Sequence, residues 1–295
     1  MYHKILSLTL AAGFMLSSGE AVMAAEITEE KSAANIYEAV ENLSSDALMS
    51  YLYSLPEANS RESTTYDQYY VDCWNELKQS NGVYLDSEGH FALEDTAAAQ
   101  YAPLAEAMES WNLAIDLGIL AVDYETMSLY TPEITGDVLD NVSSGIMALS
   151  ENIVPYASAH GCGNEVWDVE ATAAENYKTI KDFYNNMIIA SLVAPQVNPW
   201  LSTATYWVGY VREGGAWDYK RINGYENRIF CCVYGGKSNQ DQHVSWVGNY
   251  NYGYTGKVLF DLTTLHFGSS AVGGFDKKDE IEDWPAIDEG YYDAP

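Results

Sequence analysis

The residues best suited to chemistry lie near the C-terminus, in two short glycine-containing motifs. The first motif is GGAWDYK, residues 214–220, and it places the carboxylate of Asp218 two residues before the ammonium of Lys220. A carboxylate can act as a general base, and a nearby cation can stabilise developing negative charge. Taken alone, the pair is better explained as a surface ion pair beside a packed Trp217, and such a pair contributes only about 0–1 kcal/mol.

The second motif is GNYNYGYTG, residues 248–256, in which asparagines alternate with tyrosines. On a strand, Asn249 and Asn251 would share one face, and Tyr250 and Tyr252 the other. A row of amides on one face can hydrogen-bond a polar substrate, with tyrosines packed beneath it. The alternative is turn chemistry, because asparagine and glycine both favour tight turns.

A third block completes a recognisable order of motifs. The tail reads FDKKD at residues 275–279 and DEGYY at residues 288–292. With GGAWDYK and GNYNYGYTG before it, this order resembles the bacterial polymorphic toxin type 44 family over residues 197–294. The interval between the first two motifs is longer than in that family, so the residues within it receive no family role.

The resemblance implies a toxin that attacks competing cells, with ribonuclease as the activity predicted for the family and a cognate immunity protein as partner. It favours Asp218 and Lys220 as the catalytic pair, and Trp217, Asn249, Asn251 and Tyr252 as substrate-binding residues. Two alternatives stay open. One is a hydrolase of cell-wall glycan, since carboxylates suffice for chemistry on sugars. The other is a non-catalytic secreted protein that binds glycan or a cell surface through an aromatic platform.

Three further residues are secondary candidates. His243 and His266 are of the type that most often serves as general acid or base near neutral pH, although most histidines are structural. Arg212 can bind phosphate in a bidentate manner, or pair with the neighbouring Glu213. No metal-ligand spacing, phosphate loop or dinucleotide fingerprint is present in the sequence, so we expect neither a metal nor a cofactor.

The first 25 residues have the pattern of a cleavable secretory signal. Lys4 precedes a short apolar run over residues 5–16, and small residues follow at 22–24. We therefore expect a secreted, extracellular protein. No later apolar segment has the length of a membrane span, so we expect no stable membrane insertion.

Charge divides the rest of the chain. Residues 26–194 hold 29 acidic and 5 basic residues, residues 195–275 hold 5 and 6, and residues 276–295 hold 8 and 2. An acidic surface disfavours nucleic acid and anionic membranes over most of the molecule. We assign residues 26–194 to an acidic helical carrier or adaptor domain and residues 195–295 to the toxin-like domain.

Four cysteines, at positions 73, 162, 231 and 232, can form up to two disulfides in an oxidising compartment. A bridge between the adjacent Cys231 and Cys232 is sterically awkward. Pairing with Cys73 or Cys162 is therefore preferred, and the sequence leaves the choice between them open.

The overall pattern predicts a mainly α protein: an N-terminal helical bundle, then a small α+β domain with a short β-hairpin. Apolar residues recur at helical spacing in several segments. We find no internal repeat. Helices are expected over residues 33–55, 66–78, 95–122, 138–154, 169–194, 200–211 and 254–265, strands over 228–234 and 243–247, and a short helix in the tail, where Trp284, Ile287 and Tyr291 are spaced by three and four.

Overall fold

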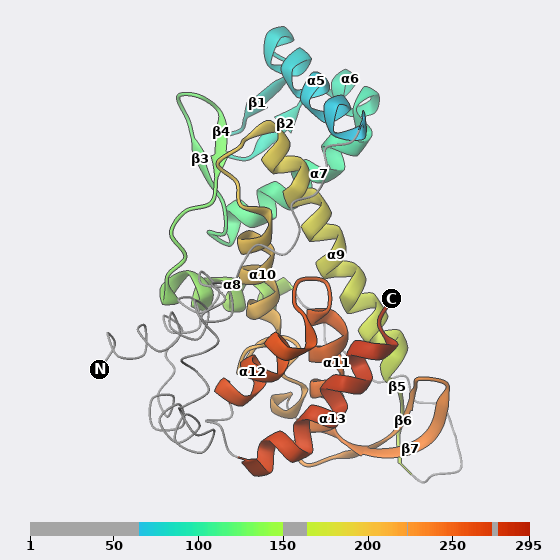
Figure 1. The fold of residues 1–295 in the computed structure, drawn as a ribbon. Coiled ribbons are helices and arrows are strands. Elements are labelled where there is room, and N and C mark those ends of the chain that lie inside the picture. The colour runs from blue at the N-terminus through green and yellow to red at the C-terminus, as the bar shows by residue number, and fades with distance from the viewer. Residues whose placement is uncertain (1–64, 150–163, 223, 273–276) are drawn as a thin grey trace, which may run out of the picture.

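The computed structural model describes residues 65–149, 164–222, 224–272 and 277–295 (Figure 1). Helices make up 61% of these residues and the strands form three small sheets, which confirms a mainly α protein. The helices are α5 (Thr65–Ser80), α6 (Asp95–Gln100), α7 (Ala102–Asp116), α8 (Gly136–Leu149), α9 (Val169–Val193), α10 (Pro199–Val211), α11 (Val244–Gly256), α12 (Leu262–Val272) and α13 (Lys277–Asp293). The strands are β1 (Val83–Leu85), β2 (Phe91–Leu93), β3 (Ala121–Asp123), β4 (Ser128–Tyr130), β5 (Val166–Asp168), β6 (Ile229–Tyr234) and β7 (Lys237–His243), and a 3₁₀ turn, η1, covers Tyr219–Arg221.

The N-terminal part of the described chain contains two successive helix–hairpin units, which the sequence reading missed. Helix α5 leads into the β1–β2 hairpin, and α7 leads into the β3–β4 hairpin. Trp74 and Asp86 in the first unit lie 37 positions before Trp111 and Asp123 in the second, although the pairing registers of the two hairpins differ by one residue. The two tryptophans meet edge to face, with ring centroids 5.8 Å apart. The expectation of an all-helical bundle was therefore wrong for this part of the chain.

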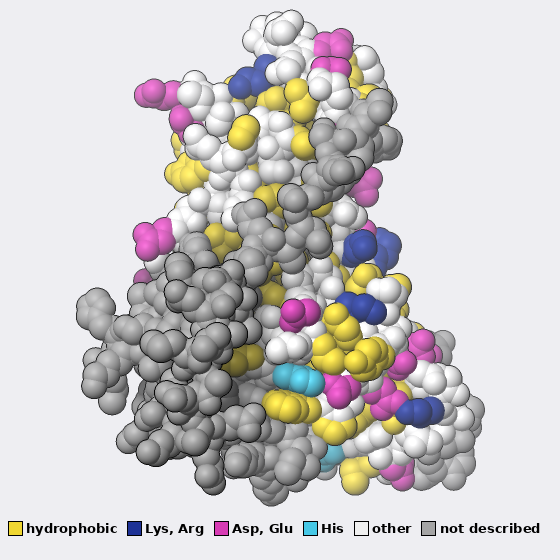
Figure 2. Space-filling model, viewed as in Figure 1, with side chains coloured by type: hydrophobic (Ala, Val, Ile, Leu, Met, Phe, Trp, Pro, Cys, Tyr) yellow, Lys and Arg dark blue, Asp and Glu magenta, His cyan; other side chains and the backbone are white. Residues whose placement is uncertain are grey.

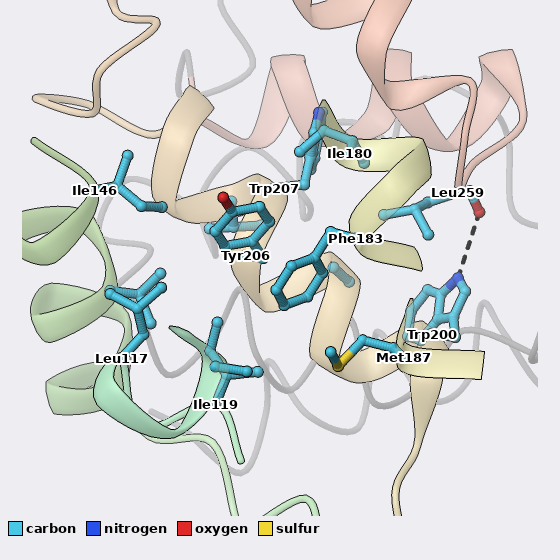
Figure 3. Close-up of a cluster of buried hydrophobic side chains, with 14 of the residues drawn as sticks. Leu117, Ile119, Ile146, Ile180, Phe183, Met187, Trp200, Tyr206, Trp207 and Leu259 are labelled. Atoms are coloured by element: carbon cyan, nitrogen blue, oxygen red, sulfur yellow. Dashed lines mark hydrogen bonds between the residues drawn. The ribbon is translucent and has the colours of Figure 1, made fainter. Parts of the chain in front are cut away.

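Helix α9 is the central element of the structure. Figure 1 shows it extending from β5 towards the helix–hairpin units, and it packs against α7, α10 and α11. Its buried residues recur at helical spacing, and Phe183 stacks on Tyr206 of α10 with ring centroids 4.0 Å apart (Figure 3). The same cluster holds Leu117, which follows α7 in the second helix–hairpin unit, and Trp200, whose Nε1 donates to the carbonyl of Leu259. One hydrophobic core thus continues across residue 194, where we placed the domain boundary, and that boundary stays a prediction.

The C-terminal part combines a three-stranded sheet with α11, α12 and α13. Strand β5 pairs in parallel with β6, and β6 pairs with β7 in an antiparallel hairpin. The predicted strand over residues 243–247 was wrong beyond its first residue. His243 is the last residue of β7 and the N-cap of α11, which begins at Val244. Its Nδ1 accepts the backbone N–H of Ser245, as an N-cap does.

Other expectations had mixed outcomes. Helices over 66–78, 169–194 and 200–211, and the tail helix, are confirmed as α5, α9, α10 and α13. The segment 95–122 instead forms two helices and a strand, and 254–265 spans the end of α11, a turn and the start of α12. The segment 138–154 agrees with α8 as far as Leu149; its remainder, and the helix over 33–55, lie outside the described residues.

The cysteines divide into two kinds. Cys231 is disulfide-bonded, whereas Cys73 and Cys232 are free and buried. The bridge between adjacent cysteines is therefore not formed. Cys162 lies outside the described residues.

Candidate functional site

The first motif forms a tight turn around Asp218. Gly214 has a φ of +76°, and its N–H donates to the Asp218 carboxylate at 2.9 Å. The Nε of Arg221 donates to the same carboxylate oxygen at 3.0 Å. The Asp218 side chain is buried, with 5% of its surface exposed, so the carboxylate holds the turn together and is not open to solvent.

Lys220, the predicted partner of Asp218, does not pair with it. Lys220 is exposed on η1, and among the described residues no ion pair involves it. Trp217 is buried and stacks on Tyr210, with ring centroids 4.1 Å apart, so it forms part of the core. The structure therefore pairs Asp218 with Arg221 in place of Lys220.

Helix α11 carries the second motif, and its geometry separates the two predicted amides. The strand interpretation was wrong, because residues two apart on a helix point in nearly opposite directions. Asn251 is buried, and Asn176 of α9 donates both to its Oδ1 at 2.8 Å and to the hydroxyl of Tyr219 at 2.9 Å. Within the described part of the chain, the Nδ2 of Asn251 has no hydrogen-bond partner. Asn249 faces the other way and donates to Asp283 of α13 at 2.6 Å.

The tyrosines of this motif are structural. Tyr252 packs against Trp207, and its hydroxyl donates to the carbonyl of Leu265 at 3.1 Å. Tyr250 is fully buried and donates to the Asp293 carboxylate at 2.9 Å. Burial first, and then that carboxylate, raise the pKa of Tyr250, so its phenol stays protonated. Because Trp217 and Tyr250 are both buried, they do not form the exposed aromatic platform of the non-catalytic alternative.

The motif glycines explain how α11 meets the tail. A Cβ at Gly253 would lie 2.8 Å from the carbonyl carbon of Ile287 in α13, and closer still to its oxygen. A Cβ at Gly290 would lie 2.8 Å from the carbonyl carbon of Tyr250, again closer to the oxygen. The two helices therefore cross with backbone against backbone, which no side chain would allow.

This crossing lies next to a histidine–carboxylate pair. The Nε2 of His266, on α12, lies 2.6 Å from Asp288 Oδ1 on α13. The imidazole stacks on Trp284 with ring centroids 4.4 Å apart and planes 4° from parallel. Among the described residues, no hydrogen bond involves Nδ1 of His266, and its side chain keeps 19% of its surface exposed.

The arrangement can perform proton transfer. When neutral His266 donates a hydrogen bond from its Nε2–H to Asp288, Nδ1 keeps a lone pair that can accept a proton from a substrate. Figure 2 shows histidine, acidic and hydrophobic side chains together on the face formed by the C-terminal helices. Of the residues predicted from the sequence, His266 fits a catalytic role best.

The remaining predicted residues have structural partners. Arg212 pairs with Asp140 of α8 at 2.6 Å, in place of Glu213. His243 caps α11 and hydrogen-bonds Ser245 Oγ at 2.8 Å. The sequence did not identify Asp288 and Trp284 as partners of His266. The one available signal was that Asp288 belongs to the third motif.

Comparison with known proteins adds no relative: no protein-family model, no curated protein and no solved structure matches the chain. Among the described residues, no helix has both the length and the apolar composition that crossing a membrane requires.

Proposed function

We propose that this chain is an exported bacterial toxin or effector whose C-terminal part, resembling polymorphic toxin type 44, hydrolyses RNA of a target cell. The acidic residues 26–194 would carry or deliver it, and a cognate immunity protein would protect the producing cell. The signal-like residues 1–25 support export and a secreted location.

One observation carries the proposal: two separate blocks of the resemblance meet in space. The Gly253–Gly290 crossing packs GNYNYGYTG of α11 against the acidic tail, and Asn249 hydrogen-bonds Asp283 across the same interface. The tail also supplies Asp288 to His266. These two motif blocks thus supply the glycines of the crossing, the Asn249–Asp283 hydrogen bond and the carboxylate beside His266.

The proposed chemistry begins with His266. Its Nδ1 would accept the proton of a ribose 2′-hydroxyl as that oxygen attacks the adjacent phosphorus and forms a 2′,3′-cyclic phosphate. The bond from phosphorus to the 5′-oxygen would break, and the 5′-oxygen would leave with a proton from solvent. Water would then open the cyclic phosphate. Asp288 would hold the imidazole and stabilise its protonated form. General acid–base catalysis of this kind contributes about 10²–10⁴-fold in rate.

The test uses the chain from residue 26, purified and incubated with total bacterial RNA, together with induced expression in a bacterial cytoplasm. His266→Asn should reduce cleavage by about 100-fold or more and restore growth. His243→Asn is the matched control, because asparagine is itself a good N-cap and should leave activity unchanged. Intact RNA and normal growth with the well-folded parent chain would refute the toxin proposal, and full activity of His266→Asn would refute the assignment of the base.

A second candidate, a cell-wall glycan hydrolase, is favoured by a different observation. Glu170 accepts the N–H of Gly235 at 2.9 Å, and Asp293 accepts the hydroxyl of Tyr250. A Cβ at Gly235 would lie 2.7 Å from Asp293 Oδ2, so the carboxylates of Glu170 and Asp293 both lie beside this one glycine. Paired carboxylates are the usual catalytic groups of glycosidases.

The two candidates differ in location and product. A glycan hydrolase should kill only when exported and should release muropeptides, and Glu170→Gln should abolish that release. Glu175→Gln, also on α9 and exposed, is the control. RNA fragments without muropeptides would eliminate this candidate.

A further inference from the structure

The two helix–hairpin units end in turns of related sequence but different chemistry. In the first turn, Asp86 Oδ1 accepts the backbone N–H groups of Glu88 and His90 at 2.8 and 2.9 Å. In the second, Asp123 Oδ1 accepts those of Glu125 and Thr126. The aspartates are therefore explained by turn formation alone.

The first turn has a histidine where the second has none. His90 occupies the position that corresponds to Met127, and a turn of this kind does not require an imidazole. The Nδ1 of His90 lies 3.7 Å from Glu88 Oε2 and 4.0 Å from Asp86 Oδ2. Three potential metal ligands, one nitrogen and two carboxylate oxygens, all lie within 4.8 Å of one another.

A fourth residue, from a different element, orients the histidine. Asp116, at the end of α7, lies 2.7 Å from Nε2 of His90 through its Oδ1. A carboxylate on one ring nitrogen fixes the tautomer and leaves the other nitrogen free, which is the usual environment of a metal-bound histidine. Here the free nitrogen is the one that faces Asp86 and Glu88.

The distances and the charge fit a cation. In tetrahedral zinc sites with bonds of about 2.0–2.2 Å, ligand atoms lie about 3.3–3.6 Å apart. The 3.7 and 4.0 Å separations exceed hydrogen-bonding distance and need to shorten by only a few tenths of an ångström. Three carboxylates surround this single imidazole, and among the described residues no lysine or arginine forms an ion pair with any of them.

We propose that Asp86, Glu88 and His90 form a binding site for a divalent transition metal such as Zn²⁺, with Asp116 as the positioning residue. The metal links both ends of the turn, and solvent completes its coordination. This site is independent of the proposed hydrolytic function, and it departs from our expectation that the chain binds no metal.

The test is calorimetric titration of the chain from residue 26, purified without a histidine tag, with ZnCl₂ near neutral pH and with CaCl₂ in parallel. We expect zinc uptake at this site that His90→Gln abolishes and that Asp116→Asn weakens by about 10–100-fold. Glu125→Gln, in the second turn, is the matched control and should bind as the parent does.

The unfolding temperature without metal shows whether a variant that loses zinc binding still folds as the parent does. Each variant should unfold at the parent temperature in EDTA, and zinc should raise that temperature for the parent but not for His90→Gln. Absence of zinc uptake by the parent, unchanged affinity in His90→Gln, or equal affinity for Ca²⁺ would overturn the proposal, since Ca²⁺ prefers oxygen ligands.

Discussion

Replacing Gly253 with alanine tests whether the α11–α13 crossing determines the stability of the C-terminal part. The added Cβ would lie 2.8 Å from the carbonyl carbon and 2.9 Å from the Cα of Ile287. Ordinary contacts of carbon with a carbonyl oxygen lie at about 3.3–3.6 Å, so the helix backbones would have to separate by roughly 1 Å. Both obstructing groups are backbone, and neither can rotate away.

The magnitude follows from two opposing terms. Overpacking of a well-packed interface costs about 1–3 kcal/mol and sometimes more. Replacing a helical glycine with alanine contributes about 1 kcal/mol in the opposite direction. Separation of the helices would also disturb Ile287, which is fully buried, and the Asn249–Asp283 hydrogen bond. We expect a net loss of about 2 kcal/mol, or roughly 4–8 °C in the midpoint for a protein of this size.

Gly248→Ala provides the matched control in the same helix and the same motif. Apart from its chain neighbours and its own helix backbone, no atom of the described residues lies within 4 Å of the position its Cβ would take, so only helix propensity changes. This variant should gain up to about 1 kcal/mol. The measurement is thermal and urea unfolding followed by circular dichroism. If Gly253→Ala proves as stable as Gly248→Ala, the helices do not cross as closely as described, and the reasoning fails.

The remaining predictions concern other parts of the molecule. Asp218→Ala should lower the free energy of unfolding in urea by about 1–3 kcal/mol, because it leaves the N–H of Gly214 without its acceptor. Lys220→Met should change the free energy of unfolding by less than about 0.5 kcal/mol. Similar values for the two variants would contradict the buried role of the carboxylate. Burial raises the pKa of Cys232 to about 12, and Cys73 is buried as well, so at pH 8 iodoacetamide should label neither thiol until denaturant is added. Labelling in native buffer, detected by mass spectrometry, would count against the described packing. Deletion of residues 276–295 removes α13 and should expose tryptophans of the C-terminal part, so unchanged fluorescence and an unchanged melting transition would show the tail to be dispensable.

Helices with long, regular apolar spacing could be predicted from the sequence. Helix α9 buries Ile180, Phe183 and Met187 at intervals of three and four, and that periodicity is unambiguous over 25 residues. The tail helix followed from Trp284, Ile287 and Tyr291 in the same way. The β1–β2 and β3–β4 hairpins could not be predicted, because strands of three residues are too short to show alternation.

The second motif was wrongly predicted as a strand because its sequence fits both the strand period of two and the helix period of 3.6 residues. Asn249 to Tyr252 alternate polar and aromatic types as a strand would, yet the residues that are buried, including Val247, Tyr250 and Tyr254, follow helical spacing. The role of Gly253 depends on a backbone 34 positions away, and that of His266 on Asp288, 22 positions away. Such contacts leave no local pattern in a single sequence.

The parallel pairing of β5 with β6 determines where this chain can be divided into fragments. A cut at residue 194 would leave β6 without its neighbour and α11 without α9. A C-terminal fragment that keeps these contacts must therefore begin before β5 and include the central helix α9. The N-terminal fragment would then lose the helix against which α5 and α7 pack.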